Sequence, residues 1–395
     1  MPWNVKTIKQ SKTRFIQQQR AGGRSFAALC RRFGISRKTG YKWRRRFRTR
    51  GWAGLIARTR NVRSNRRQCH PKWHRRLRRL RLAHPLWGAK KLRRLLVERY
   101  GGRAVPHRAT LGRWLQQWGC SGPRRRRTRR GPALLRPGLT RPRQSNDVWT
   151  VDFKGWFRTG DGTRIEPLTV RDLFSRFILV VVLLADQSYP RTRAALVSLF
   201  TQRGLPRRIR VDNGGPFGSN GAAGLSRLSV WWVRLGIIVE FIRPAHPEDN
   251  GGHERMHRDY KAETARPPAG TPRGQRGRSR RFVHRYNFER PHEALGLQRP
   301  AQVYRRSRRA YPGRLTELKY PTGWKVRRVR SNGTIRWEGR LRFVGEAFVG
   351  QRVGLKPASN QLYAVYFAGV LLGQMHTADR SGMRPATYAR RSKPN

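Results

Sequence analysis

Acidic residues are rare in this chain, and three of them stand at positions where carboxylates could work together. The 395 residues include 20 Asp plus Glu against 90 Lys plus Arg. Asp152 ends one apolar, strand-like segment, Asp212 ends another, and Glu254 follows a third at the start of a helical segment. Functional groups converge at the strand ends of an open α/β sheet, so we expect these carboxylates to meet.

Carboxylates gathered inside a very basic protein predict a site for divalent cations. Mg²⁺ prefers oxygen ligands and is held by few carboxylates together with water and substrate phosphates. Two such ions about 4 Å apart can activate the attacking oxygen and stabilise the leaving oxygen of a phosphoryl transfer. The pattern therefore predicts metal-dependent nucleotidyl transfer, with two Mg²⁺ (or Mn²⁺) ions held by Asp152, Asp212 and Glu254.

Each acid taken alone has an ordinary structural explanation. Asp212 is followed by Asn213 and Gly214, which together form a turn signal. Asp152 could be a surface residue at a strand end, and Glu254 could balance Arg258 four residues later on its helix. Only their combination, in this order and with these elements between them, points to a catalytic site.

The charge composition indicates the class of molecule that this protein binds. A formal net charge of +70 attracts polyanions, so nucleic acid is the expected partner, although part of the charge could be a compositional bias toward Arg. No run of about 18 apolar residues exists and the N-terminus has no apolar core of a signal peptide, so we expect no membrane contact.

The cysteines predict a reducing, cytoplasmic location. Cys30, Cys69 and Cys120 are odd in number and far apart, which argues against a disulfide framework. Cys69 and His70, with His74, could resemble metal ligands, but no paired CxxC supports a zinc site.

The first 121 residues predict two helical DNA-binding units. In the first, helical segments in "SFAALCRRFGI" and "SRKTGYKWRRRF" form a helix-turn-helix pattern with Ser36 as N-cap. The second of these helices would enter the major groove, and the side chains expected to face DNA are Arg37, Lys38, Tyr41 and Lys42. A small helical bundle without DNA contact is the plainer interpretation. Residues 70–118 predict three more helices, the first ending before Pro85.

The remaining chain predicts a mixed α/β sheet followed by short strands. Three antiparallel strands, with a hairpin turn at Asp161-Gly162, precede alternating helices and strands. We expect a loop rich in Arg, Pro and Gly over residues 266–280, and then one more helix. Short alternating strands from about residue 315 to 376 favour a small antiparallel barrel.

The predicted organisation is multidomain, with α-helical units, a mixed α/β core and a C-terminal β-barrel. Its expected parts are a helix-turn-helix unit (1–60), a second helical unit (65–121), a basic linker (122–146), the catalytic core (147–310), a small β-barrel (311–376) and a basic, unstructured tail (377–395).

Several motifs together resemble one family. "WTVDFKG", "RVDNGGPF", "PEDNGGHERMHRDYKAE" and "YNFERPHEALGLQRPAQVY" are similar to the core of DDE insertion-sequence transposases, which resembles the retroviral integrase core and has a ribonuclease H-like fold. "LCRRFGISRKTGYKW" and "HPLWGAKKLRRLL" are similar to the helix-turn-helix region of the same transposases. The resemblance therefore covers the chain to about residue 376.

The resemblance implies that Asp152, Asp212 and Glu254 form a DDE triad. Many relatives place about 35 residues between the second Asp and the Glu, and this spacing alone would select Glu248. The context favours Glu254, which follows Asn-Gly at the start of a helix and has Arg258 and Lys261 at i+4 and i+7, positions from which both could reach DNA phosphates. Glu248 and Asp249 are expected to form a loop and a helix cap.

Three further positions match family motifs. Asn213 and Gly214 would shape the turn that aims Asp212. Arg290-Pro291-His292 matches a frequent signature whose expected role is structural and DNA-proximal. Asp172 and Ser175 match a position that we expect to form a folding turn.

The function that the resemblance implies is DNA transposition. Such an enzyme binds the terminal inverted repeats of a mobile element, hydrolyses a phosphodiester bond at each end, and joins the freed 3′-OH to target DNA. Its expected partners are double-stranded DNA and further copies of the chain, in a bacterial cytoplasm near the nucleoid. The alternatives are a ribonuclease H-like nuclease that cuts without joining, a catalytically silent DNA-binding regulator of transposition, and a basic RNA-packaging protein.

Overall fold

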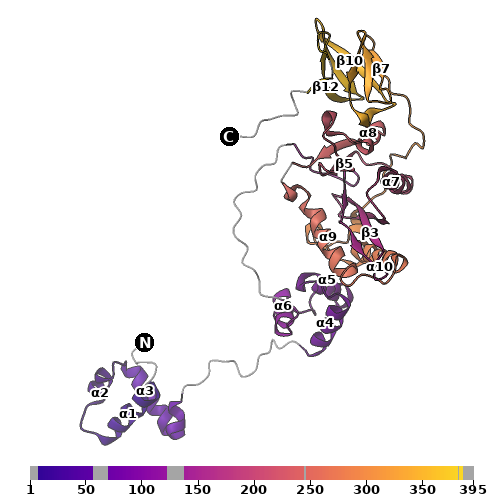
Figure 1. Ribbon diagram of the computed structural model, residues 1–395. Helices are drawn as coiled ribbons and strands as arrows, with labels where there is room; N and C mark the ends of the chain where they lie inside the picture. The colour runs from indigo at the N-terminus through magenta and orange to yellow at the C-terminus, as the bar shows by residue number, and fades with distance from the viewer. Residues whose placement is uncertain (1–7, 57–69, 122–137, 244–245, 381, 386–395) are drawn as a thin grey trace. The chain divides into compact units, whose positions relative to one another are not determined.

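The computed structural model describes residues 8–56, 70–121, 138–243, 246–380 and 382–385 (Figure 1). The chain divides into two compact units, Met1–His70 and Pro71–Asn395. Cys69, most of the predicted linker and the end of the predicted tail lie outside the described residues. Within the described part of the chain, no helix is long and apolar enough to span a bilayer.

The first unit is a small helical bundle that contains the predicted helix-turn-helix. Its elements are α1 (Ile8–Ala21), α2 (Phe26–Arg32), α3 (Arg37–Arg50) and the short 3₁₀ helix η2 (Gly51–Leu55). Ser36 caps α3 as predicted, because its Oγ accepts a hydrogen bond from the Thr39 backbone N–H at 3.2 Å. Phe15, Leu29 and Trp43 are buried in the core that the helices share.

The second unit begins with a three-helix bundle. Its helices are α4 (Lys72–Ala83), α5 (Ala89–Tyr100) and α6 (Arg108–Gln117). Apolar residues at helical spacing, such as Leu92 and Leu96 on α5 and Leu111 and Leu115 on α6, are buried. α4 ends two residues before Pro85, where the chain cannot continue as a regular helix. The three helices predicted for residues 70–118 are confirmed.

The core is a mixed sheet with β1 at its centre. The elements are β1 (Val148–Phe153), β2 (Phe157–Arg158), β3 (Arg164–Asp172), β4 (Ile178–Leu184), α7 (Tyr189–Arg203), β5 (Arg208–Val211), η3 (Ala222–Gly224), α8 (Arg227–Arg234) and β6 (Ile238–Phe241). β3 runs antiparallel to β1 and to β4, whereas β5 runs parallel to β1 and to β6. The long strands therefore lie in the order β4-β3-β1-β5-β6, the mixed sheet expected of a ribonuclease H-like core.

The two faces of this sheet differ in chemistry because side chains alternate along a strand. Trp149 and Val151 of β1 face the apolar core that α7 and α8 cover. Thr150 and Asp152 of β1 lie on the opposite face, where they approach α9 (Gly251–Thr264). Figure 1 shows the helices of these two layers on different sides of the strands. Around Asp152 this second face is polar, whereas further along it Ile178 of β4 packs against Met256 and Tyr260 of α9.

The loop predicted for residues 266–280 is wrong. Only residues 265–271 connect α9 to a further helix, α10 (Pro272–His284). α10 continues into a π-helical turn, η5 (Arg285–Glu289), and is followed by η6 (Glu293–Leu295) and α11 (Pro300–Val303). Thr271 caps α10 and Pro272 occupies its first turn, where a missing N–H is tolerated. Gln275, Ser279 and Phe282 recur at helical spacing and are buried. The glycines and prolines hid this amphipathic pattern.

The end of the predicted linker is part of the core. Asp147 accepts hydrogen bonds from the backbone N–H groups of Arg143 (2.8 Å) and Gln144 (3.1 Å). Arg210 of β5 donates to the Thr140 carbonyl at 2.7 Å. These contacts attach residues 140–147 to the sheet.

The C-terminal region forms two antiparallel sheets. Its elements are β7 (Lys325–Arg328), β8 (Thr334–Trp337), β9 (Arg340–Phe343), η7 (Glu346–Phe348), β10 (Arg352–Ser359), β11 (Leu362–Phe367), β12 (Val370–His376) and β13 (Arg384–Pro385). One sheet has the order β13-β12-β11-β10-β7, and β8 pairs with β9 separately. Closure into a barrel stays a prediction. Leu225 and Val230, from the end of η3 and from α8, share the apolar cluster of these strands.

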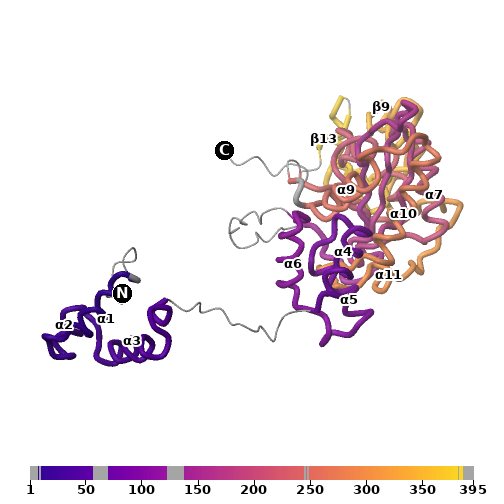
Figure 2. Tube along the Cα trace, turned by 90° about the horizontal axis from the view of Figure 1, so that it is seen from below, coloured from indigo at the N-terminus to yellow at the C-terminus, as the bar shows by residue number. Residues whose placement is uncertain are grey.

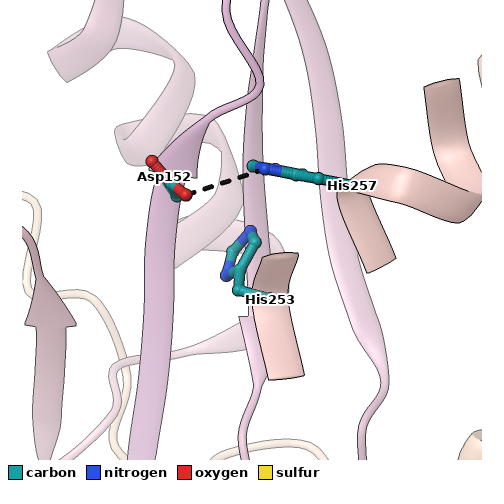
Figure 3. A group of neighbouring side chains, drawn as sticks. All are labelled: Asp152, His253 and His257. Atoms are coloured by element: carbon teal, nitrogen blue, oxygen red, sulfur yellow. Dashed lines mark ion pairs between the residues drawn. The ribbon is translucent and has the colours of Figure 1, made fainter. Parts of the chain in front are cut away.

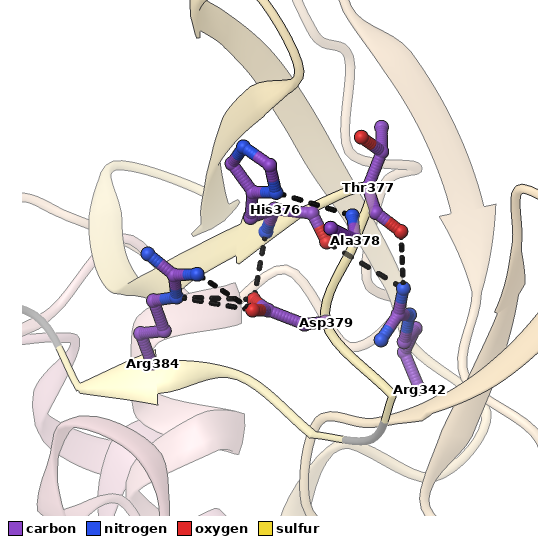
Figure 4. Close-up of polar contacts among 6 residues, drawn as sticks. All are labelled: Arg342, His376, Thr377, Ala378, Asp379 and Arg384. Carbon is purple, nitrogen blue, oxygen red and sulfur yellow. Dashed lines mark hydrogen bonds and ion pairs between the residues drawn. The ribbon is translucent and has the colours of Figure 1, made fainter.

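The prediction of an unstructured tail from residue 377 is wrong for its first part. Asp379 accepts a hydrogen bond from the His376 N–H at 2.9 Å and binds the Arg384 guanidinium at 2.7 Å (Figure 4). The fully buried Arg342 donates to the Thr377 carbonyl at 2.9 Å. These contacts fold the chain back so that β13 pairs with β12. Polar contacts of this kind leave no apolar periodicity in the sequence.

Candidate active site

The carboxylates of Asp152 and Asp212 belong to neighbouring parallel strands. The register pairs Thr150 with Arg210, so two residues further along the same strands Asp152 stands beside Asp212. Asp212 follows β5 directly, and its side chain is more exposed than that of Asp152. Because β1 and β5 are parallel, both carboxylates lie at the carboxyl ends of these strands, on the same side of the sheet, as predicted.

Glu254 lies in the first turn of α9, close enough for its charge to act on Asp152. Burial, followed by the negative charge of Asp212 and more weakly that of Glu254, raises the pKa of Asp152 to about 7. Burial also raises the pKa of Asp212 above its ordinary value. The negative charges of both other predicted carboxylates therefore act on Asp152. Repulsion among the three groups favours the binding of a cation between them.

No Lys or Arg of the described residues forms an ion pair with any of these three carboxylates. Most other acids do have such a partner: Glu240 pairs with Arg208 and Arg210, for example. In a chain of +70 formal charge, carboxylates without a basic partner are unusual.

The turn after β5 holds Asp212 in place. The Asn213 amide donates from Nδ2 to the Ile242 carbonyl at 2.7 Å, which ties the turn to the end of β6. A Cβ at Gly218 would lie 2.5 Å from the Asn213 carbonyl oxygen, so this close approach requires glycine. The backbone at Gly214 also hydrogen-bonds the Asp212 carboxylate and opposes the effect of burial on its pKa.

The other two acids of "HPEDNGGHERMHR" lie in a 3₁₀ turn, Pro247–Asn250, before α9. The Asp249 carboxylate is buried and binds the Arg243 guanidinium through two contacts of 3.0 and 3.1 Å. Asp249 and Asn250 were expected to form a turn or a helix cap: the turn is present, and Asn250 occupies the N-cap position without a side-chain capping hydrogen bond. The side chain of Glu248 lies outside the described residues.

A polar layer that was not predicted from the sequence lies between α9 and the sheet. It consists of Thr150, Thr169, His253 and His257. Thr169 Oγ1 lies 2.6 Å from His253 Nε2 and 2.7 Å from His257 Nε2, and Thr150 Oγ1 lies 2.8 Å from His253 Nδ1. His257 Nδ1 faces Asp152 Oδ2 at 3.7 Å (Figure 3). The two histidines four apart in the sequence were the available signal.

This polar layer is electrically neutral. Burial, reinforced by the charges of Lys154 and Arg171, lowers the pKa of His257 to about 3. Burial likewise lowers the pKa of His253 well below its ordinary value. The fully buried Arg171 on β3 donates to the Gly252 carbonyl at the start of α9. Neutral imidazoles therefore separate Asp152 from that buried cation.

Basic side chains lie near this site. Arg258 and Lys261 are exposed on α9, and their contact with DNA phosphates stays a prediction. Lys154, two residues beyond Asp152, was missed. Burial, together with repulsion from Lys261 and Arg266, lowers the pKa of Lys154, and the charge of Asp152 opposes this effect. The arrangement places cations beside the carboxylates without pairing them directly.

The predicted DNA-facing residues of α3 are all exposed. Arg37, Lys38, Tyr41 and Lys42 lie on its outer surface, and Tyr41 stacks on Phe26 with ring centroids 4.3 Å apart. A surface depression there is also lined by Arg45 and Arg48. Contact with DNA stays a prediction.

Arg290 of the Arg-Pro-His motif anchors α9 from behind. Its Nη2 lies 2.6 Å from Asp259 Oδ2, and its Nη1 lies 4.0 Å from Glu263 Oε1. Glu293, the residue after the motif, pairs with Lys90 of α5 at 2.8 Å, so the chain that follows the motif contacts the three-helix bundle. Figure 2 shows α5 near α11. These contacts fit the structural part of the expected role, and proximity to DNA stays a prediction.

The predicted folding turn at Asp172 is present. The Asp172 carboxylate accepts bonds from the Ser175 N–H (2.7 Å), the Ser175 hydroxyl (2.5 Å) and the Asn146 N–H (2.7 Å). All three residues are buried. The turn connects β3 to β4 and fixes the start of the core segment.

Comparisons with known proteins match separate parts of the chain. Residues 142–247 and 235–300 match two models of an integrase core domain, residues 12–80 match a helix-turn-helix domain, and residues 324–381 match the C-terminal domain of IS481 family transposases. The resemblance expected from the motifs is confirmed for these domains.

Two insertion-element proteins are similar in sequence. An uncharacterized 31.7 kDa protein of insertion element IS407 from Burkholderia multivorans is 29% identical over 208 residues, which cover 52% of this chain and 72% of that protein. An uncharacterized 39.2 kDa protein of IS476 from Xanthomonas euvesicatoria is 29% identical over 184 residues, 45% of this chain and 50% of that protein.

Among solved structures, the HTLV-2 integrase catalytic core domain in complex with magnesium is 16% identical and has a TM-score of 0.31. It covers 42% of this chain and 100% of its own. A simian T-cell lymphotropic virus intasome bound to a PP2A regulatory subunit has a TM-score of 0.35 at 16% identity, over 75% of this chain and 97% of its own.

Proposed function

We propose that this chain, which combines a helix-turn-helix domain, an integrase core domain and the C-terminal domain of IS481 family transposases, is a DNA transposase. It binds the terminal inverted repeats of an insertion sequence, cleaves a phosphodiester bond at each end and joins the 3′-OH to target DNA. The matching domains support transposase function at the level of the family, and the steps on DNA are our proposal.

The observation that supports the proposal is that Asp152 lies near Asp212 and Glu254, while no Lys or Arg of the described residues pairs with any of the three. Strand register places the first two side by side, and the charge of Glu254 reaches Asp152. Three oxygen-donor groups that repel one another fit a hard divalent cation, so the residues present suit Mg²⁺ or Mn²⁺. We propose that these three residues hold two such ions.

The bound ions supply Lewis-acid activation of the attacking oxygen and stabilisation of the leaving oxygen. The residues of the chain orient the DNA. Arg258 and Lys261 bind backbone phosphates beside the carboxylates, and Lys154 adds a third positive charge there. The Asp212 turn and the anchored α9 keep the carboxylates in fixed positions, which limits reorganisation during the reaction.

We propose that DNA recognition is separate from catalysis. Helix α3 enters the major groove with Arg37, Lys38, Tyr41 and Lys42, and the three-helix bundle adds a second contact with the end of the element. Two ends must be joined to one target, so the active form is a homo-multimer on DNA. A nuclease that cuts without joining would not need these recognition helices, and a silent regulator would not need the unpaired carboxylates.

The test compares two glutamates in one assay. Purified protein is incubated with labelled element ends, plasmid target and Mg²⁺, using the unmutated chain and the variants Glu254→Gln and Glu248→Gln. We expect Glu254→Gln to abolish both cleavage and joining while end binding is retained, and Glu248→Gln to remain active. Joining by Glu254→Gln but not by Glu248→Gln would refute the assignment of Glu254. Binding of ends without cleavage by the unmutated chain would favour the silent regulator.

A further inference from the structure

The hydrogen-bond partners in the polar layer indicate which ring nitrogens of His253 and His257 carry protons. Thr169 Oγ1 lies 3.0 Å from the Asp152 carbonyl oxygen, and a carbonyl can only accept, so the single hydroxyl proton is donated there. The same oxygen also contacts His253 Nε2 and His257 Nε2. With the hydroxyl proton directed to that carbonyl, both imidazoles donate from Nε2.

The Nδ1 atoms of the two rings then differ in their surroundings. His253 Nδ1 lies 2.8 Å from Thr150 Oγ1, which also lies 3.4 Å from the Arg171 carbonyl oxygen, so both nitrogens of His253 have a hydroxyl partner within 2.8 Å. His257 Nδ1 has no hydrogen-bond donor among the described residues and faces Asp152 Oδ2 at 3.7 Å. That distance exceeds the 2.7–3.2 Å typical of a hydrogen bond, so no proton is shared between them.

A nitrogen lone pair and a carboxylate oxygen that face each other across 3.7 Å suit a cation between them. Asp152, His253 and His257 form a cluster of possible metal-ligand atoms within 4.8 Å of one another. With bonds of roughly 2.1–2.2 Å from an ion to His257 Nδ1 and to Asp152 Oδ2, the 3.7 Å between these two atoms corresponds to a ligand–ion–ligand angle of about 120°.

The far side of the His257 ring has the support that metal-bound histidines require. Such a histidine usually donates its second N–H to a fixed acceptor, which sets the tautomer and the ring orientation. Here the acceptor is Thr169, itself held by the Asp152 carbonyl. His257 is 7% exposed, and its helix is tied to the sheet through Gly252 and Arg171.

We propose that His257 Nδ1 is a nitrogen ligand of the cation that Asp152 binds, so that this position prefers Mn²⁺ to Mg²⁺. The inference rests on the proposed function only for the presence of a cation at Asp152. Imidazole suits transition-metal ions, whereas Mg²⁺ is bound mainly by oxygen. His253 is excluded as a ligand because both of its nitrogens are already engaged.

The test measures metal binding to the full-length protein without DNA. Mn²⁺ is added, and electron spin echo modulation detects ¹⁴N nuclei bonded to the ion. We expect an imidazole ¹⁴N signal in the unmutated protein, its replacement by a ¹⁵N signal after histidine labelling, and its loss in His257→Gln. Competition between Mn²⁺ and Mg²⁺ should show that His257→Gln lowers the preference for Mn²⁺ at least about 10-fold.

Two controls keep the result interpretable. His253→Gln should retain the ¹⁴N signal, and circular dichroism should show that each variant folds; a signal lost in His253→Gln but kept in His257→Gln would overturn the proposal. The proposal would also be overturned if the unmutated protein bound Mn²⁺ without showing a ¹⁴N signal, or if it did not bind Mn²⁺ at all. A protein that shows the signal but never joins DNA ends would instead refute transposase function, and one that joins ends without the signal would refute this inference alone.

Discussion

Replacing Arg290 by Met should destabilise the second unit by about 3–5 kcal/mol, the usual effect of removing one partner of a buried ion pair. Arg290 and Asp259 are only 7% and 14% exposed, and their closest atoms are 2.6 Å apart. Met fills similar volume but leaves Asp259 and Glu263 without this partner. The Arg290 guanidinium also lies 5.3 Å from the Tyr286 ring centroid, a contact that Met would lose.

The pH dependence gives a second readout of the same change. Burial raises the pKa of Glu263, and the charges of Arg285 and Arg290 oppose this effect. Without Arg290 the folded-state pKa rises further, so the folded protein binds more protons than the unfolded chain at weakly acidic pH. Folding is then favoured as pH falls. The loss in the free energy of unfolding caused by Arg290→Met should therefore become smaller as the pH is lowered from 7 to 5.

The assay is urea unfolding followed by tryptophan fluorescence, with Arg280→Met on the exposed face of α10 as the matched control. The control should lie within about 0.5 kcal/mol of the unmutated protein. A cycle with Asp259→Leu should give a coupling well above the 0.3–0.5 kcal/mol expected of independent sites. A loss below about 1 kcal/mol for Arg290→Met, or an additive cycle, would refute the anchoring role of this arginine.

Three other changes test separate parts of the chain. Lys42→Ala should weaken binding of DNA ends and reduce the slope of log affinity against log salt by about one, measured by fluorescence anisotropy; an unchanged slope would remove Lys42 from the interface. Phe282→Ala should destabilise the second unit by about 3–5 kcal/mol in urea unfolding, because this ring is buried beneath α10; a neutral result would show that α10 is not packed as described. Burial, with repulsion from Arg290, lowers the pKa of Lys91 to about 8, so above that pH the unfolded chain binds more protons than the folded protein. The free energy of unfolding should therefore rise from pH 8 to about 10. Lys91→Met should abolish this rise, and a rise that persists in the variant would assign it to another group.

The sequence predicted the parts of the site that follow from strand order. Asp152 and Asp212 each end an apolar segment, and the parallel pairing of β1 with β5 brings them together. Ser36 was predicted as a cap because capping depends on local residues alone. Such features can be predicted from the sequence because they do not depend on which elements pack against one another in the folded protein.

Features that depend on tertiary contacts were missed. α10 contains Gly274 and Gly277 and many arginines, so its apolar stripe is only Phe282 with the polar Gln275 and Ser279. Those two are buried because the Gln275 side chain bonds the Ala269 N–H and the Thr264 carbonyl, and Ser279 bonds Tyr260. Burial compensated by hydrogen bonds has no signature in hydrophobic periodicity.

The polar layer explains how a carboxylate stays available in so basic a protein. With 90 Lys and Arg in the chain, an acid near any of them is readily neutralised, as Asp249 is by Arg243 and Asp259 by Arg290. The inner face of α9 instead presents neutral imidazoles to Asp152, and its cations Arg258 and Lys261 lie on the exposed surface. A cation at position 257 would pair with Asp152 across the same 3.7 Å gap and displace any bound metal ion. His257→Lys should therefore abolish Mn²⁺ binding more completely than His257→Gln, although both remove the same imidazole, and equal binding by the two variants would refute this electrostatic argument.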